Sequence, residues 1–436
     1  MKLSHASRWL FGFVILGSLT GWVLTGMMIY ARLAYLGILL MGGALIWTVL
    51  SINGFRLTRN TRTLRASMGE VFEEHYEIKK EKWPGSLWLE VLNQSTLPKA
   101  AGSRLLTRIV AHQLRYYSAR TLLIRRGAYL LGPTTMTSGD PFGLFTMRRV
   151  VTARDTLIIL PMTFPISIFP PPPGLLPGGK AIRQRSFDMT PNAAEVREYI
   201  PGDPMKRIHW PSTAHRGQFM VKEFEQDPQA DIWIFLDAFR PVHYSMPELP
   251  VSYHLDNMWL RQPKVSLPRD TFEYSVSVAA SLGRFFLMDR RAVGLACAAG
   301  RFSVVPCERG ERQINKIMET LAFLQPEGTM PLIELVFIQA KLLPLGSGVV
   351  IITPSAGPDL LLALEDLQRR HLRPVVVLIK SETFGGPGES EKAVASLLSR
   401  NISVCQIGFG DDLSAQLALP ARHFQRSNVI NLNPRL

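Results

Sequence analysis

The sequence predicts an α/β protein with two N-terminal transmembrane helices, a small antiparallel β-domain and a C-terminal doubly wound, Rossmann-like domain. Two long uncharged stretches open the chain, short and partly alternating segments follow to about residue 160, and Val- and Ile-rich runs alternate with amphipathic segments beyond residue 229. A chain of 436 residues is too long for one ordinary core, so we expect two or three domains.

Residues 1–56 are expected to form a helical hairpin in the membrane. Trp9 to Tyr30 and Leu33 to Ile52 contain no charged side chain, and Arg32 lies between them. Each stretch would reach roughly 30 Å as a helix, which matches the apolar core of a bilayer. A cleaved signal peptide is the alternative, but no small-x-small cleavage pattern follows Tyr30.

The arginines and lysines around these stretches predict the orientation of the hairpin. Lys2 and Arg8 precede the first stretch, and a group of basic residues follows the second: Arg56, Arg59, Arg62 and Arg65. The positive-inside rule then places both ends of this cell-membrane protein in the cytoplasm. Gly17 and Gly21 make a G-x-x-x-G pair, which either joins the two spans or makes a dimer.

The soluble part divides by composition. Residues 57–160 are predicted to form a β-sandwich-like domain that ends in the turn "SGDPFGLF", Ser138 to Phe145. The proline-rich residues 161–180 predict an extended linker. Residues 181–228 hold a motif described below, and residues 229–436 predict a mostly parallel sheet covered by helices on both faces.

The net charge and the cysteine content indicate which classes of partner and which cellular compartment to expect. The formal net charge of +14 is spread along the chain, which indicates an anionic partner or a surface close to acidic lipids and does not favour nucleic acid. The three cysteines are far apart and form no C-x-x-C, which is typical of buried thiols in a reducing compartment.

The segment "REYIPGDPMKRIHWPSTAHRG" has features of a turn and of a chemical site. Ile200 to Asp203 fit a type II turn, Asp203 and Pro204 fit the start of a helix "PMKRIHW", and "QFMVKEFE" predicts a strand. We consider a structural or docking element, a partner-binding surface, and a catalytic site. The last would use Asp203, His209 and His215 as metal ligands or acid/base groups, with Arg197, Arg207 and Arg216 binding phosphate.

The same segment resembles the signature of the bacterial domain-of-unknown-function fifty-eight family. The matching positions are Arg197, Tyr199, Gly202, Asp203, Arg207, Ile208, His209, Trp210, Ala214, Val221, Glu223 and Phe224. "RRGAYLLGP" and "DPFGLF" also resemble the end of that family's β-domain. His215 departs from the pattern, which usually has Arg there, and Arg216 is adjacent to it.

The resemblance implies that residues 229–436 form a von Willebrand factor A-like domain. Such domains bind Mg²⁺ through Asp-x-Ser-x-Ser, a Thr and a further Asp. This chain offers Asp237 and Thr329, but Phe239 and Pro241 occupy the two Ser positions, and Thr353 stands where the further Asp would be. We therefore expect no metal ion or other cofactor, with Asp237 and Thr329 as weak candidates for Mg²⁺.

The resemblance also implies a partner. Members of the family resemble proteins that work together with MoxR-type AAA+ ATPases and act in complex assembly at the membrane. We therefore expect a non-enzymatic, membrane-anchored scaffold whose interaction motif comprises Arg197, Tyr199, Gly202, Asp203, Arg207, His209, Trp210 and Arg216. The alternative is a metal-dependent hydrolase or phosphodiesterase centred on Gly202 to Trp210. The client and the oligomeric state stay open.

Overall fold

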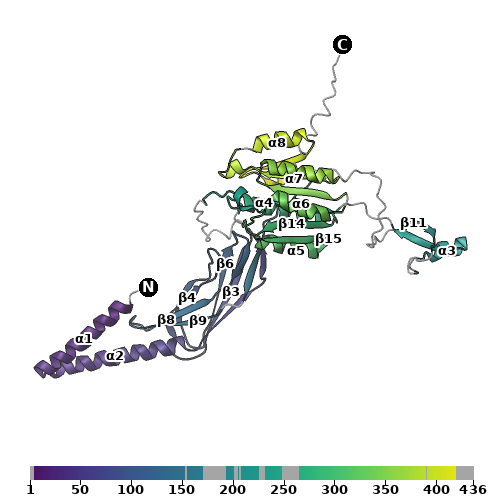
Figure 1. The fold of residues 1–436 in the computed structure, drawn as a ribbon. Coiled ribbons are helices and arrows are strands. Elements are labelled where there is room, and N and C mark those ends of the chain that lie inside the picture. Colours follow the sequence, from purple (N-terminus) through teal and green to yellow (C-terminus); the bar gives the residue numbers. More distant parts are fainter. Residues whose placement is uncertain are drawn as a thin grey trace, which may run out of the picture. The chain divides into compact units, whose positions relative to one another are not determined.

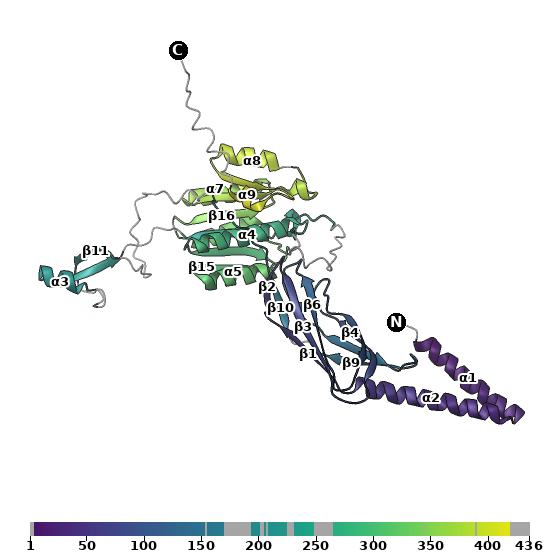
Figure 2. The ribbon, with the colours of Figure 1, turned by 180° about the vertical axis from the view of Figure 1, so that it is seen from behind.

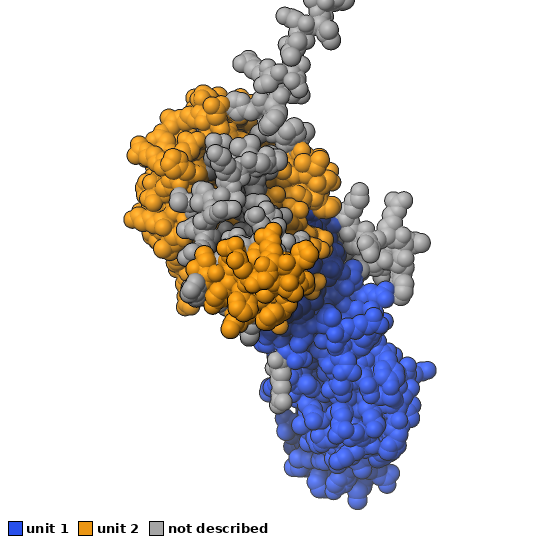
Figure 3. All heavy atoms as spheres, turned by 90° about the vertical axis from the view of Figure 1, so that its right-hand side faces the viewer, with its two compact units in different colours: residues 1–164, 245–280, 315–325 blue, residues 165–244, 281–314, 326–436 orange. Residues whose placement is uncertain are grey.

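The computed structural model describes residues 4–152, 155–169, 193–200, 205, 208–224, 231–247, 265–344, 346–388 and 390–418. Two compact units make up the chain (Figure 3). Unit 1 comprises residues 1–164, 245–280 and 315–325, and unit 2 comprises residues 165–244, 281–314 and 326–436. The domain boundaries expected from composition stay predictions.

Two apolar helices, α1 (Ser4–Thr25) and α2 (Met28–Ile52), run side by side at the start of unit 1 (Figures 1 and 2). Of the described helices, α2 is the one long and apolar enough to cross a membrane, with a mean hydropathy of 2.1, whereas the apolar part of α1 covers only Trp9–Thr25. The break between the helices lies at Gly26, whose positive φ of 66° ends α1. Arg32 therefore lies inside α2, and the uncharged stretch Trp9 to Tyr30 does not form one helix, because the break falls within it.

The end of α2 is held by the β-domain. Lys80 is fully buried, and its Nζ donates to the carbonyls of Ser51, Asn53 and Leu50, which have no partner inside the helix. Burial lowers the pKa of Lys80 to about 8. Because a lysine at a helix C-terminus both donates to the last carbonyls and complements the helix dipole, it fixes the helix to strand β3.

The β-domain consists of short strands in three sheets. Their orders are β1 (Phe55–Thr61), β3 (Val71–Lys80), β6 (Leu114–Leu122); β2 (Arg65–Ser67), β10 (Thr156–Leu160), β7 (Gly127–Leu130); and β5 (Arg104–Ile109), β4 (Ser86–Asn93), β8 (Thr134–Gly139), β9 (Thr146–Val151). All pairs are antiparallel except β2 with β10. Inward side chains of the first and third of these sheets, among them Tyr76, Ile78 and Leu89, make one core.

The larger sheet confirms the predicted mixed α/β fold with parallel strands. Its order is β15 (Arg301–Glu308), β14 (Val293–Ala299), β13 (Ile232–Leu236), β16 (Gly348–Thr353), β17 (Arg373–Ile379) and β18 (Ser403–Ile407), with β15 antiparallel to the rest. Its helices are α4 (Thr271–Met288), α5 (Glu311–Phe323), α6 (Leu332–Gln339), α7 (Pro358–Arg369), α8 (Ser390–Ser399) and α9 (Leu413–Ala418). Residues of α4 and α5 contribute to both units.

The strand order creates a switch point between β13 and β16. The chain leaves β13 for β14 on one side and later adds β16 on the other side. All five residues of β13 are buried, which agrees with the continuous apolar run "IWIFL" in a sheet covered on both faces. In open α/β sheets, the C-terminal ends of the two strands beside a switch point are the usual location of a functional site.

Candidate functional site

The first candidate site is a small module that we call the signature module: β11 (Ala193–Glu198), α3 (Trp210–Arg216), β12 (Met220–Phe224) and the described residues between them. Figure 1 labels β11 and α3. β11 and β12 pair antiparallel. The helix differs from the prediction, because Ile208 bridges to Val221 and α3 begins only at Trp210. Pro211 in the first turn favours this later start, since a proline there loses no helical hydrogen bond.

Hydrogen bonds within the signature module fix its shape. The backbone nitrogen of His209 donates to the carbonyl of Met220 at 2.7 Å, and the nitrogen of Met220 donates to Oγ1 of Thr213 at 3.0 Å. Gly217, with φ of 69°, ends α3 and turns the chain into β12. Ile208, Met220 and Val221 are buried, so the module has a small apolar centre.

Large apolar side chains on the signature module face solvent. Trp210 is 64% exposed, and Ile200, Met205 and Phe219 are also exposed. The backbone nitrogen of Tyr199 donates to the carbonyl of Phe219 at 2.8 Å, and the two rings lie edge to face with centroids 6.2 Å apart. Exposed aromatic residues on a hydrogen-bonded backbone are typical of protein-binding surfaces rather than of cores.

The structure brings only part of the predicted motif together. Tyr199, His209, Trp210 and Arg216 lie on the hydrogen-bonded segments of the module, and Arg216 is exposed in the last turn of α3. The backbone of Arg197 belongs to β11, but its side chain lies outside the described residues. Three further predicted residues lie wholly outside them: Gly202, Asp203 and Arg207.

The candidate acid/base residues do not form a site in the described part of the module. Nδ1 of His209 is 2.6 Å from Oγ of Ser212, which engages one ring nitrogen, and His215 is exposed on α3. Asp203 lies outside the described residues. Across the residues that the structure describes, no three His, Cys, Asp or Glu side chains gather in a way that suits a metal ion.

The second candidate site is the switch point, where Asp237 directly follows β13 and Thr353 ends β16. Asp237 is 3% exposed, and Oγ1 of Thr353 donates to its Oδ2 at 2.6 Å. The backbone nitrogen of Phe239 donates to Oδ1 at 3.0 Å. Burial raises the pKa of Asp237 to about 6, although both hydrogen bonds favour the charged form.

His243 completes this arrangement, and sequence reasoning missed it. Its Nε2 donates to the backbone carbonyl of Asp237 at 3.1 Å, and burial lowers the pKa of His243 to about 4, so the ring is neutral at pH 7. The one sequence signal was its position six residues after Asp237, in "DAFRPVHY".

The residues at the switch point do not fit a Mg²⁺ ion. Both carboxylate oxygens of Asp237 already accept hydrogen bonds, and Phe239 and Pro241 supply no side-chain oxygen where hydroxyl ligands would be needed. Thr329 is exposed beside Gly328, whose nitrogen donates to the carbonyl of Ala238. The partner of Asp237 is therefore Thr353, and its geometry is that of a buried structural hydrogen bond.

One family match covers sequence from both candidate sites. A family model described as "Protein of unknown function DUF58" matches residues 195–248, which run from β11 through β13 to the residues after Asp237. These findings support the DUF58 family. The DUF58 match therefore covers the signature module and one side of the switch point as one continuous segment.

A relative supports the same assignment over a longer stretch. The chain is 24% identical over 213 residues to the uncharacterized protein YeaD of Bacillus subtilis (strain 168). The match covers 48% of this chain and 46% of YeaD, so the chain spans about half the length of the relative it matches.

The buried state of Asp237 predicts a pH dependence of stability. The pKa of Asp237 is higher in the folded protein than the ordinary value of 3.8, so the folded protein favours the protonated carboxyl group. The resulting gain in the free energy of unfolding is fully present below pH 3.8 and is lost as the pH rises through about 6. We expect the free energy of unfolding to fall by about 2–3 kcal/mol more in wild type than in Asp237→Asn between pH 4 and pH 7.

Urea unfolding of the full chain in detergent at several pH values measures this difference. Added Mg²⁺ at pH 7 should leave the unfolding midpoints of both proteins unchanged, because both carboxylate oxygens of Asp237 already accept hydrogen bonds and Phe239 and Pro241 bring no side-chain oxygen. Equal pH slopes for the two proteins, or a Mg²⁺-dependent shift in wild type alone, would show that Asp237 has another role.

Proposed function

We propose that this chain is a membrane-anchored, non-enzymatic scaffold on the cytoplasmic side, which binds a protein partner through its signature module and a von Willebrand factor A-like domain. The partner that the family resemblance implies is a MoxR-type AAA+ ATPase acting in complex assembly. One observation carries the proposal: the module holds its backbone with internal hydrogen bonds and leaves Trp210 and Phe219 in solvent.

The membrane anchor is supported by α2 and by its attachment to the β-domain. α2 is long and apolar enough to cross a bilayer, and α1 packs along it with a shorter apolar segment. In the proposed two-span arrangement, Arg56 and Arg59, directly after α2, lie on the cytoplasmic side with the rest of the chain. Lys80 then fixes the end of the membrane helix to the β-domain.

The von Willebrand factor A-like assignment is supported by sheet topology. The chain runs through the sheet so that β13 is central, β14 and β15 lie to one side, and β16, β17 and β18 to the other, with an antiparallel β15 at the edge. Asp237 at the end of the first strand has the position of the first metal ligand in such domains. Its hydrogen bond to Thr353 supports a domain that binds its partner without a metal ion.

A capture experiment tests the docking surface. The tagged full chain is cross-linked in its native membranes, purified in detergent, and compared with Trp210→Ala. We expect at least a tenfold loss of captured AAA+ ATPase, because truncation of a central aromatic anchor costs about 2 kcal/mol or more of binding free energy. The matched control is Phe302→Ala, which removes another exposed aromatic ring, on β15.

The control variant should capture the ATPase as wild type does. Equal capture by Trp210→Ala and wild type would remove the module from the interface, and capture of no ATPase by wild type in a host that encodes one would contradict the scaffold proposal. The hydrolase alternative predicts metal-dependent turnover of phosphoesters by the purified chain. The engagement of His209 by Ser212 does not favour it.

A further inference from the structure

The turn between β8 and β9, singled out in the sequence as "DPFGLF", is held rigidly by one carboxylate. Asp140 is buried, its Oδ2 accepts hydrogen bonds from the nitrogens of Phe142 and Leu144 at 2.8 and 3.2 Å, and its Oδ1 accepts one from the nitrogen of Phe145. Gly143 takes a positive φ of 71° within the turn. A turn ordered in this way presents its side chains in fixed directions.

This turn lies against the two apolar helices. Oγ1 of Thr48 on α2 is 3.5 Å from the carbonyl oxygen of Phe145. Phe145 also lines an apolar groove of about 450 Å³ together with residues of both helices, among them Gly12 and Leu16 of α1 and Leu45 of α2. The views in Figures 1 and 2 agree that β8 and β9 lie beside α2.

The groove residues place the turn level with the apolar part of the hairpin. The apolar segment of α1 begins at Trp9, and Gly12 lies three residues further, about 4.5 Å along the helix axis. Leu45 lies well before the end of α2 at Ile52. Phe145 therefore lines a groove whose helix residues begin about one turn inside the apolar segment of α1, and its carbonyl lies beside Thr48, one turn before the end of α2.

The outer side of the turn is apolar and exposed. Phe142 is 57% exposed, although its backbone is fixed, and Pro141 beside it is also exposed. Arg148 is exposed on β9, the strand that leaves the turn. An aromatic ring at the level of an apolar helix surface, followed by a cation, is the combination that suits the boundary between acyl chains and anionic headgroups.

We propose that the β8–β9 turn enters the cytoplasmic interface of the bilayer, with the ring of Phe142 among the lipid acyl chains and Arg148 at the phosphates of anionic lipids. This inference rests on the proposed membrane anchor and adds a third contact with the bilayer to the two helices. Because Asp140 holds the turn, and Lys80 and Thr48 hold α2, the β-domain would sit on the membrane in one fixed orientation.

Spin labels at single cysteines test the inference in the full chain reconstituted in vesicles of phosphatidylcholine and phosphatidylglycerol. The background is Cys307→Ser, since Cys297 and Cys405 are buried. Labels are placed through Phe142→Cys at the turn, Leu39→Cys at an exposed position of α2, and Val71→Cys at the end of β3 that is about 30 Å from Lys80. Collision rates with oxygen and with a water-soluble nickel complex give the depth of each label.

We expect oxygen to relax the label at position 142 at least three times more effectively than the label at position 71, with the label at position 39 deeper still. An aqueous label at 142 beside a deep label at 39 would overturn the inference and leave the membrane anchor intact. An aqueous label at 39 would instead contradict the anchor itself. If Phe142→Cys fails to fold, as judged by circular dichroism, Pro141→Cys on the same turn gives the same reading.

Discussion

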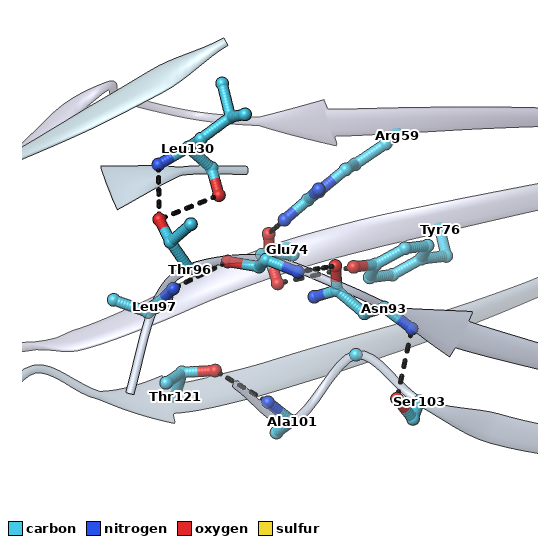
Figure 4. A network of polar contacts seen from close by, with 12 residues as sticks. Arg59, Glu74, Tyr76, Asn93, Thr96, Leu97, Ala101, Ser103, Thr121 and Leu130 are labelled. Atoms are coloured by element: carbon cyan, nitrogen blue, oxygen red, sulfur yellow. Dashed lines mark hydrogen bonds and ion pairs between the residues drawn. The ribbon is translucent and has the colours of Figure 1, made fainter. Parts of the chain in front are cut away.

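Replacement of Arg59 by Met is expected to destabilise the β-domain by about 3–5 kcal/mol, because it leaves a buried carboxylate without its cation. Glu74 is fully buried on β3, and Nε of Arg59 donates to its Oε1 at 2.8 Å, with a second contact from Nη2 (Figure 4). Oη of Tyr76 donates to Oε2 at 3.4 Å. Burial and the charge of Glu74 raise the pKa of Tyr76, so its hydroxyl stays a donor.

The adjacent residue on the same strand supplies the matched control. Glu73 pairs with Arg120 at 3.3 Å, but both side chains are substantially exposed because successive residues of a strand face opposite sides. Arg120→Met should therefore cost less than about 1 kcal/mol. Urea unfolding in detergent measures the free energy of unfolding of both variants and of wild type.

A double-variant cycle separates the ion pair from general packing. Arg59→Met combined with Glu74→Gln should be less destabilised than the sum of the two single variants, because the double variant has no buried charge left. If Arg59→Met and Arg120→Met cost the same, or if the two single effects simply add, Glu74 is not held as a buried ion in the folded protein.

Replacement of Arg126 by Met should have an effect of similar size within unit 1. Nε of Arg126 donates to the carbonyl of Leu321 at 3.0 Å, Nη2 donates to the carbonyl of Leu324 at 2.6 Å, and Nη1 pairs with Glu273. The guanidinium also lies 5.2 Å from the ring centre of Phe272. One side chain thus satisfies carbonyls at the C-terminal end of α5 and a carboxylate in the first turn of α4.

Loss of Arg126 leaves two sets of buried polar groups without their partner: the carboxylate of Glu273 and the carbonyls at the end of α5. Burial raises the pKa of Glu273 and Arg126 opposes that rise, so Glu273 in the variant takes up a proton more readily, and the carbonyls at the end of α5 lose their donor. We expect a loss of about 3–5 kcal/mol in the free energy of unfolding. The control is Arg65→Met, whose 2.7 Å pair with Glu319 also reaches α5 but is exposed, and it should change stability by less than about 1 kcal/mol.

Hydrogen exchange measured by mass spectrometry locates the effect. In Arg126→Met, amides at the start of α4 and the end of α5 should exchange faster, while the core strands β3 and β4 keep their protection. Unchanged exchange at α4 and α5 would mean that these contacts do not order the two helix ends.

The sequence predicted those elements whose apolar pattern is complete over their own length. β13, β16 and β17 each contain a continuous apolar run, and every residue of β13 is buried, so no tertiary information was needed to find them. β15 and α6 were missed. β15 is an edge strand with Pro306 and a mixed exposure pattern, and the eight residues of α6 are apolar nearly all round, which gives no helical period.

The helix boundaries predicted in the hairpin and in the motif were wrong because of the local backbone conformation. The charge of Arg32 separates the two apolar stretches in the sequence, but the chain turns at Gly26, because glycine adopts a positive φ without a steric cost. In the motif, Pro204 indicated a helix start, whereas Ile208 forms an isolated β-bridge with Val221 and α3 begins two residues later, at Trp210.

Buried charges were overlooked although the pattern contained them. In "VFEEHYEIKK" the inward positions of β3 are Phe72, Glu74, Tyr76, Ile78 and Lys80, at a strict period of two. Glu74 and Lys80 therefore belong to the same face as the core residues, and only their charge suggested solvent. The contact of Asp237 with Thr353 required knowledge of strand order, because the two residues are 116 positions apart in the chain.

Site-specific photo-crosslinking from position 210 tests the central claim most directly. A photoreactive phenylalanine analogue replaces Trp210 in the full chain in native membranes, and the same analogue at Phe302 on β15 serves as the control. The scaffold account predicts a covalent adduct with a AAA+ ATPase from position 210 and none from position 302. Adducts from position 210 that contain no ATPase, or phosphoester turnover by the purified chain alone, would contradict it.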